Sequence, residues 1–168
     1  MEMPVPADTD TALADSPELA LLIRLLKLGS LINAPMKEGV CDPAGISQIE
    51  LKVMMALAGE GSLAGHDLVT IMGVPAMNVS RAIATLKQRG WVEDARDPDN
   101  RRRKPVRLTA AGEATYAGLG PALEGVATAL AGGLTVAQQR QFGQAADRII
   151  AAMSDWLANH HEGLWLRD

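Results

Sequence analysis

The sequence is poor in aromatic residues and in cysteine. Aromatic side chains make up 3% of the 168 residues, so a hydrophobic core must be built from Leu, Ile, Val, Ala and Met. Such a composition favours packed helices over a β-sandwich, because strands are enriched in aromatic and β-branched residues. The one cysteine, Cys41, excludes an internal disulfide framework and is typical of a reducing cytosol. With 48% apolar and 21% charged residues, the chain suits one globular domain.

A hydrophobic run of membrane-spanning length is also missing. The most apolar stretch, LALLIRLLKLGSLI, contains Arg24 and Lys27 and is shorter than the ~20 residues that cross a bilayer. The first residues carry acidic side chains, where a signal peptide would carry basic ones. We therefore expect a cytoplasmic protein with no membrane contact, in which residues 1–15 form a flexible N-terminal arm.

Catalytic and metal-binding signatures are absent as well. The sequence shows no paired carboxylates in an apolar setting, no phosphate-binding loop and no nucleophile motif, and its three histidines suggest no triad. His160 and His161 are adjacent, which is poor spacing for metal ligands, and His66 is distant in sequence. We expect a protein that is not an enzyme and that needs neither a metal nor another cofactor.

What the sequence does have is an uneven distribution of charge. The net charge is −4, yet residues 76–110 contain nine Lys and Arg against four acids, so the remainder carries −9. Much of this positive charge lies in RDPDNRRRKPVRLTAAG, residues 96–112. One basic face on an acidic body is typical of a nucleic-acid-binding protein. Charge alone leaves a solvated, charged loop as an equal alternative.

The middle of the chain has the pattern of a helix-turn-helix followed by a β-hairpin. Ser47 and Glu50 form a capping box that begins a helix ending at Gly59 to Gly61, with a predicted buried stripe of Leu51, Met54, Met55 and Ala58. A short helix from Gly65 to Met72 follows, closed by Gly73, and then a helix that ends at Gly90. In this last helix Val79, Ile83 and Leu86 should face inward, and Met77, Arg81, Ala84 and Gln88 outward. WVEDARD and KPVRLT then read as a hairpin with a basic tip, which is a wing.

Helices are also predicted on both sides of this unit. Ser16, Pro17 and Glu18 begin a helix that should run to about Asn33, before a loop at residues 36–45. It is apolar around most of its circumference, so we expect a partner subunit to cover it. The C-terminal segment is helical, with a capping box at Thr135 and Gln138 and further apolar surface at Phe142, Ile149, Ile150, Met153, Trp156 and Leu157. Trp165 is expected to clamp across a subunit boundary, with a frayed chain end as the alternative.

The order of these elements resembles the MarR (multiple antibiotic resistance regulator) family of winged helix-turn-helix transcriptional regulators. The sharpest match is DLVTIMGVPAMNVSRAIATLKQRGWVEDARDPDNRRRKPVRLTAAG, residues 67–112, which follows the family pattern without a gap. It includes the Val79-Ser80-Arg81 centre, the Arg96-Asp97-Pro98 and Arg101-Arg102 of the wing, and the Leu108-Thr109 that begins the next helix. The resemblance extends over roughly residues 16–160.

Three positions depart from the family pattern. Asn100 stands where an aspartate usually precedes the arginine pair, so Asp97 or Asp99 should brace the wing arginines. Ala64 replaces the usual hydroxyl cap of the first helix-turn-helix helix, a loss of ~1 kcal/mol. Pro105 lies in the returning strand, which we expect to be tolerated because a wing has free edges.

The resemblance implies a mainly α fold with three parts. These are the arm at 1–15, a helical dimerisation region at 16–45 and 110–168, and a winged helix-turn-helix DNA-binding lobe at 46–109. The protein is expected to be a homodimer bound to double-stranded DNA at a near-palindromic operator, since one recognition helix reads few base pairs. The alternative is a monomer that folds its apolar helices onto itself. The residues expected to contact DNA are Met77, Asn78, Ser80, Arg81, Thr85, Arg101, Arg102, Arg103 and Lys104.

The resemblance also implies regulation by a small molecule. Members typically repress promoters and are released by small anionic, often aromatic, compounds such as phenols and carboxylates, as in aromatic compound catabolism. The candidates for binding such an effector are polar residues on apolar segments, Arg24, Ser30, Asn33 and His66. Two alternatives remain: an oxidant sensor acting through Cys41, or a regulator with no effector. The acidic neighbour Asp42 should raise the pKa of the Cys41 thiol and reduce its reactivity.

Overall fold

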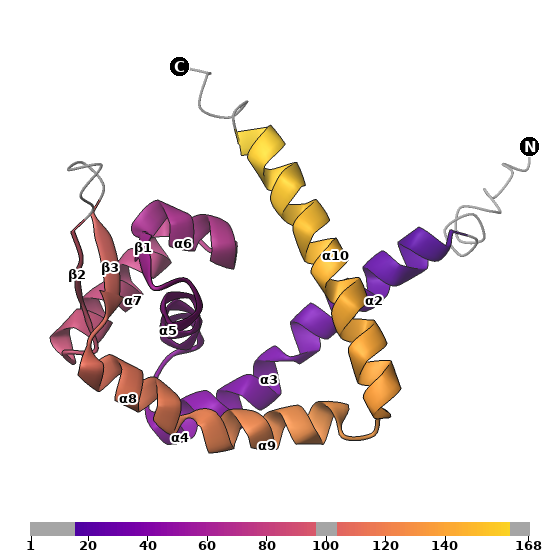
Figure 1. Cartoon of the computed structure of the whole chain (residues 1–168), viewed down its shortest axis with the longest axis horizontal. Helices are drawn as coiled ribbons and strands as arrows, with labels where there is room; N and C mark the ends of the chain where they lie inside the picture. Colours follow the sequence, from indigo (N-terminus) through magenta and orange to yellow (C-terminus); the bar gives the residue numbers. More distant parts are fainter. Residues whose placement is uncertain (1–15, 97–103, 162–168) are drawn as a thin grey trace, which may run out of the picture.

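The computed structural model describes residues 16–96 and 104–161, and it is mainly helical, as predicted (Figure 1). The first segments of the chain are α2 (Pro17–Leu31), α3 (Asn33–Met36), the π-helix η1 (Lys37–Cys41), α4 (Asp42–Ala44) and α5 (Gln48–Glu60). The central unit contains β1 (Ser62–Ala64), α6 (Gly65–Met72), α7 (Ala76–Gln88), β2 (Val92–Asp94) and β3 (Pro105–Leu108). The chain continues through α8 (Ala110–Gly118), α9 (Gly120–Ala131) and α10 (Val136–His161).

The predicted loop at residues 36–45 is wrong, because this segment is helical. Pro35 and Pro43 lack the backbone N–H of a helix interior, and the helix around them is irregular, with a turn at Ile32 and the π-helix η1 between the two prolines. Val40 and Cys41 in η1 are each 1% exposed and pack against Leu119 and neighbouring side chains. Tertiary burial therefore overrides the local loop signals of this stretch.

This extension also corrects the membrane analysis. Residues 17–44 form one helix of 28 residues that is long and apolar enough to cross a membrane by length and composition. The α6–α7 and α8–α10 segments would pass the same test if each bent pair were one span. The sequence argument ended the first helix near Asn33 and so judged it too short. The far end of this helix is nevertheless packed into the protein through Val40 and Cys41.

The main core lies among α5, α6, α7 and the small sheet. Val53, Met54, Leu68 and Leu86 are each fully buried there. The predicted stripe of α5 is half right: Leu51 and Met54 are buried, but Met55 and Ala58 are exposed. Val53 and Leu57 take the inward positions instead. Because α5 packs against α7 and the sheet on one side and η1 on another, its buried face is set by two neighbours rather than by one stripe.

The sheet has three antiparallel strands in the order β1-β3-β2. The hairpin of β2 and β3 is confirmed, whereas β1 was missed because three residues are too few to show a period. β3 is therefore the central strand, and the explanation given for Pro105, a free wing edge, is wrong. Pro105 is tolerated because it is the first residue of β3; its carbonyl accepts a hydrogen bond from the Ala95 amide at 2.8 Å.

The predicted helix caps are confirmed. The Ser16 hydroxyl accepts from the Leu19 amide, and Ser47 and Glu50 form both hydrogen bonds of a capping box. The Thr135 hydroxyl accepts from the Gln138 amide at 3.2 Å, and the Gln138 side chain accepts from the Thr135 amide at 2.9 Å. Ala64 offers no cap to α6, but the Asp67 carboxylate accepts from the Ala64 amide at 2.9 Å. Half of a capping box thus remains at this helix start.

No residue of α2 and no described side chain of α10 is buried, and both helices expose large apolar side chains. α2 has no buried residue, and Ile23, Leu26 and Leu31 are 54%, 64% and 61% exposed. On α10, Phe142, Ile150 and Trp156 are 55%, 59% and 58% exposed. In Figure 1 both helices project away from the compact unit formed by α5, α6, α7 and the sheet.

Candidate nucleic-acid interface

The helix-turn-helix is built around a sharp turn at Gly73. Gly73 has a φ of 61°, a left-handed conformation that favours glycine, and its amide donates to the Val69 carbonyl at the end of α6. Pro75 precedes α7 with an extended backbone, and the chain bends by 119° between α6 and α7. This is the arrangement in which the second helix of the pair is held against the first and turns its other side outward.

α7 separates a buried side from an exposed polar side. Val79, Ala82 and Leu86 are buried, and Ile83 is half-buried against the same core, which confirms the predicted inward face. Met77, Arg81, Ala84 and Gln88 are exposed, as predicted, and Ser80 is exposed beside them. No acidic residue occurs in α7. The exposed side of α7 therefore offers a hydroxyl, an amide and a guanidinium, and no carboxylate from its own helix.

The start of α5 lies beside this helix. Asn78, Arg81 and Thr85 line a shallow hollow of about 160 Å³ together with Ser47 and Glu50. Three of the five α7 residues predicted to contact DNA thus share one side of the helix, and Met77 and Ser80 lie next to it. The Thr85 hydroxyl donates to the Arg81 carbonyl at 3.1 Å, so its proton is already used within the helix.

Ser47 was identified from sequence only as a helix cap. Its position across the hollow from Arg81 could not be recognised, because the two residues are 34 positions apart and only the packing of α5 against α7 joins them. The polar start of α5 is therefore an addition to the predicted interface.

Several of the basic residues are engaged within the protein. Lys87 forms an ion pair with Asp94 at 2.6 Å, and Arg107 forms one with Glu93 at 2.7 Å. Arg89 donates to the Gly45 carbonyl at 2.9 Å and lies 5.0 Å from the centre of the Trp91 ring. These cations brace the lobe, and their charge is partly neutralised by their neighbours.

The other described cations of residues 76–110 are exposed to solvent. Arg81, Arg96 and Lys104 are exposed, and none of them forms an ion pair with a described residue. Arg96 follows β2 and Lys104 precedes β3, so both lie at the end of the wing hairpin. Arg96 was not among the predicted contacts; its place in the family-like wing motif was the available signal. Arg101, Arg102 and Arg103, with Asp97 and Asp99, lie outside the described residues.

The four predicted effector residues are not brought together within one subunit's hollows. The Ser30 hydroxyl donates to the Leu26 carbonyl at 3.0 Å, and the Asn33 amide donates to the Gly29 carbonyl at 3.0 Å. Arg24 is exposed on α2, and His66 is exposed on α6, 3.1 Å from the Asp67 carboxylate. The hollows on α10, between α5 and α8, and beside α7 are lined by other residues. The effector assignment stays a prediction.

Cys41 is a poor candidate for a reactive thiol. Its side chain is 1% exposed, and burial, followed by the nearby Asp42 carboxylate, raises the pKa of the thiol above its ordinary value. The direction agrees with the sequence analysis, although burial rather than the acid is the larger cause. Among the described residues, no group of three His, Cys, Asp or Glu side chains could hold a metal ion.

A turn-linked helix pair, an acid-free outer helix and an adjoining hairpin together define a winged helix-turn-helix. Residues 44–103 match the model of the MarR family. This part of the chain, the helix pair with the start of the wing, is therefore similar to the MarR family. Members of this family are DNA-binding transcriptional regulators. No curated protein sequence matches it significantly.

Solved structures share the MarR fold with this chain. The Escherichia coli MarR mutant C80S in complex with operator DNA is 20% identical, with a TM-score of 0.63 over 79% of this chain and 95% of that one. Bordetella bronchiseptica BpsR, studied for its regulation by 6-hydroxynicotinic acid, is 23% identical, with a TM-score of 0.63 over 79% and 98%. Rhodococcus jostii RHA1 CouR, bound to p-coumaroyl-CoA, is 16% identical, with a TM-score of 0.66 over 82% and 94%.

Proposed function

We propose that this protein is a cytoplasmic MarR-family repressor that binds a near-palindromic operator as a homodimer and leaves it when a small molecule binds. The observation that carries the DNA contact is the exposed side of α7. Arg81 lies there without an ion-pair partner among the described residues, on a helix that has no acidic residue. Nearby cations that are not part of this surface, Lys87 and Arg107, are paired.

α7 is suited to the major groove of DNA, which admits an α-helix and presents base edges to its side chains. We assign Met77, Asn78, Ser80 and Arg81 to this contact. Asn78 and Arg81 are side chains that can form paired hydrogen bonds with adenine and guanine edges. Because Thr85 is half-buried and its hydroxyl proton is used by the Arg81 carbonyl, we assign it a contact as an acceptor or through its methyl group.

The wing is suited to the minor groove beside it. Arg96 and Lys104 are exposed at the described ends of the hairpin, and Arg101, Arg102 and Arg103 belong to the same basic segment. An arginine inserted in a narrow A·T-rich minor groove meets enhanced negative potential. We assign that insertion to Arg101 or Arg102, with Arg103 and Lys104 at nearby phosphates.

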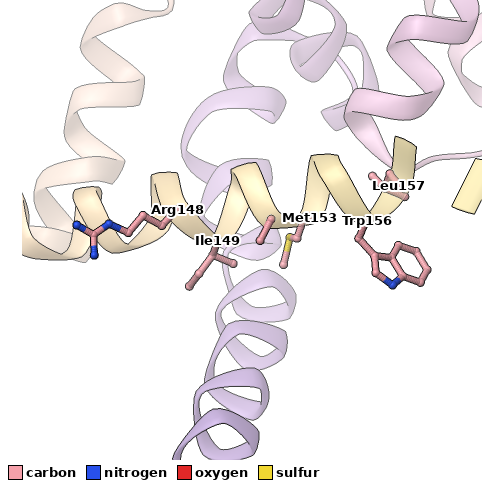
Figure 2. A pocket seen from close by; sticks show the side chains of 6 residues that line it. Arg148, Ile149, Met153, Trp156 and Leu157 are labelled. Atoms are coloured by element: carbon pink, nitrogen blue, oxygen red, sulfur yellow. The ribbon is translucent and has the colours of Figure 1, made fainter. Parts of the chain in front are cut away.

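A second copy of the chain is the proposed partner of α2 and α10. A hollow of about 580 Å³ on α10 is lined by Ile149, Met153, Trp156 and Leu157, with Arg148 and Ala152 (Figure 2). Figure 2 shows these side chains spaced along one helix, α10. α2 adds Leu22, Ile23 and Leu26, each at least 47% exposed. Surfaces this apolar on one subunit are typical of permanent interfaces.

We infer that an aromatic or anionic effector, a phenol or a carboxylate, controls DNA binding. Support comes from two proteins of the same fold: one is regulated by 6-hydroxynicotinic acid and the other was crystallised with p-coumaroyl-CoA. Such a ligand acts only through different affinity for the DNA-bound and free conformations. An effector-independent regulator is the second possibility. An oxidant sensor based on Cys41 is disfavoured by the burial of that thiol.

A gel-shift assay with the DNA upstream of the protein's own gene tests the proposal. We expect a dimer to bind this DNA at low salt. Its affinity should fall steeply as salt is added, because contacts with phosphates release counterions. A panel of phenols and aromatic acids should then release the DNA. Failure of the native protein to bind any duplex at low salt would refute the regulator, whereas binding that no compound alters would refute only the effector.

A further inference from the structure

A second hollow lies at the C-terminal end of α5, whereas the start of α5 borders the recognition surface. It has a volume of about 370 Å³ and is lined by Leu57, Ser62, Arg107, Leu108, Glu113 and Tyr116. These residues come from α5, β1, β3 and α8, so the hollow lies where the sheet and the first helix after it meet α5. Its volume is within the range of roughly 300–1,000 Å³ that holds small-molecule ligands.

The residues are brought together by both sheet register and helix spacing. Ser62 and Arg107 are register partners on β1 and β3. Glu113 and Tyr116 are three positions apart on α8, so they share one side of that helix. Leu57 is buried, and Tyr116 is half-buried against the core and against the cluster around Cys41. The floor is thus apolar and fixed, whereas the ionisable groups stand at the rim.

The charges of the rim do not cancel. The Arg107 guanidinium is already paired with the Glu93 carboxylate, at 2.8 Å from Nε and 2.7 Å from the second nitrogen. Glu113 is exposed and forms no ion pair with a described residue. The hollow is therefore left with one uncompensated carboxylate.

The C-terminal end of α5, beside the hollow, reinforces this sign. α5 ends at Glu60, so its C-terminal carbonyl groups, with their partial negative charge, lie next to Gly61 and Ser62. The N-terminal amides of α8 carry the opposite, partial positive charge, and one of them, the Gly112 amide, donates to the Thr109 hydroxyl at 3.0 Å. The Tyr116 ring adds an aromatic face, which attracts cations.

We propose that this hollow binds a small organic ammonium compound, with the ammonium group at Glu113 and an apolar or aromatic body against Leu57, Leu108 and Tyr116. The site is distinct from the DNA-binding surface, and its ligand has the opposite charge to the anionic effector proposed above. It does not depend on the proposed function, since binding can be measured on the protein without DNA.

Titration with 2-phenylethylamine tests the site, with 3-phenylpropionate as a probe of similar size and opposite charge. Two-dimensional NMR of the full chain should show amide shifts at residues 57–62 and 113–116 for the amine, with at least tenfold weaker binding of the carboxylate. Equal binding of both probes, or shifts confined to other regions, would refute the proposal.

Variants test whether the Glu113 carboxylate binds the ammonium group. Glu113→Gln should weaken amine binding by about tenfold or more, because a hydrogen bond to a charged group is lost. Glu113→Asp should retain most of it, which separates loss of charge from disturbance of α8. Glu124→Gln removes an exposed carboxylate from α9 and should leave binding unchanged. If Glu113→Gln and Glu124→Gln bind the amine alike, the assignment is wrong.

Discussion

The lobe around α7 and the helices α2 and α10 differ in how much of their apolar surface one subunit buries. In the lobe, Val53, Met54, Leu68 and Leu86 are buried completely by the same chain. α2 and α10 are just as apolar in places, yet α2 has no buried residue and Trp156 on α10 is 58% exposed. The lobe buries its own hydrophobic core, whereas α2 and α10 leave a hydrophobic surface exposed within one subunit. Their stability should therefore depend on protein concentration, and that of the lobe should not.

The largest expected effect comes from opening the core of the lobe. Leu68→Ala removes a side chain that is 0% exposed and should lower the free energy of unfolding by about 2–5 kcal/mol. Denaturant titration followed by circular dichroism measures this loss. Leu26→Ala, at a position 64% exposed, is the matched control. The loss of unfolding free energy in Leu26→Ala should be small at low protein concentration. An equal loss in both variants at every protein concentration would contradict the difference between the lobe and α2.

Charge placed on α10 should separate the subunits without unfolding the lobe. Ile150→Arg with Met153→Arg puts two cations on a surface where those side chains are 59% and 49% exposed in one subunit. Burying them in an interface would cost several kcal/mol, so the dimer should dissociate at micromolar concentration. Sedimentation velocity gives the oligomeric state, and the NMR signals of residues 53–86 report on the lobe. If the dimer persists in this variant, the interface does not include this surface of α10.

Removal of the unpaired cation on α7 should weaken DNA binding and leave the fold intact. Arg81→Ala should cost about 1–3 kcal/mol of binding free energy if Arg81 reads a base. If it contacts phosphate instead, the slope of log affinity against log salt should fall by about 1. Fluorescence anisotropy at several salt concentrations distinguishes the two. Arg140→Ala, an exposed cation on α10, should change neither.

Cys41 should give the smallest effect on DNA binding. Because burial raises the pKa of its thiol above the ordinary value, the thiolate fraction at neutral pH is lower than in an unfolded chain. Native protein should therefore react slowly with iodoacetamide, and the rate should rise on unfolding. Cys41→Ser should preserve operator affinity before and after peroxide treatment. Rapid labelling of the native thiol, or a peroxide response that this variant abolishes, would revive oxidant sensing.

Prediction from the sequence succeeded where local signals and burial agree. The caps at Ser16, Ser47 and Thr135, the turn at Gly73 and the inward face of Val79 and Leu86 are all confirmed. These features depend on residues within a few positions of one another. The outward face of α7, with Arg81, could be predicted for the same reason.

Prediction failed where distant segments decide the outcome. Residues 36–45 contain loop-forming residues, yet contacts of Val40 and Cys41 with Leu119 keep the segment helical. Met55 is exposed and Val53 buried, because α5 faces α7 and η1 together. The short strand β1 exists only through its pairing with β3, and this pairing makes the strand of Pro105 central.

The sequence by itself determined the helix pair and the hairpin that follows it. These follow from periodicity, capping and charge, which act over short distances along the chain. Only the tertiary structure decided which cations remain available, since Glu93 and Asp94 neutralise Arg107 and Lys87 while Arg81 stays unpaired among the described residues. It also placed Glu113 and Tyr116 beside Leu57, because a hollow forms from the packing of separate elements.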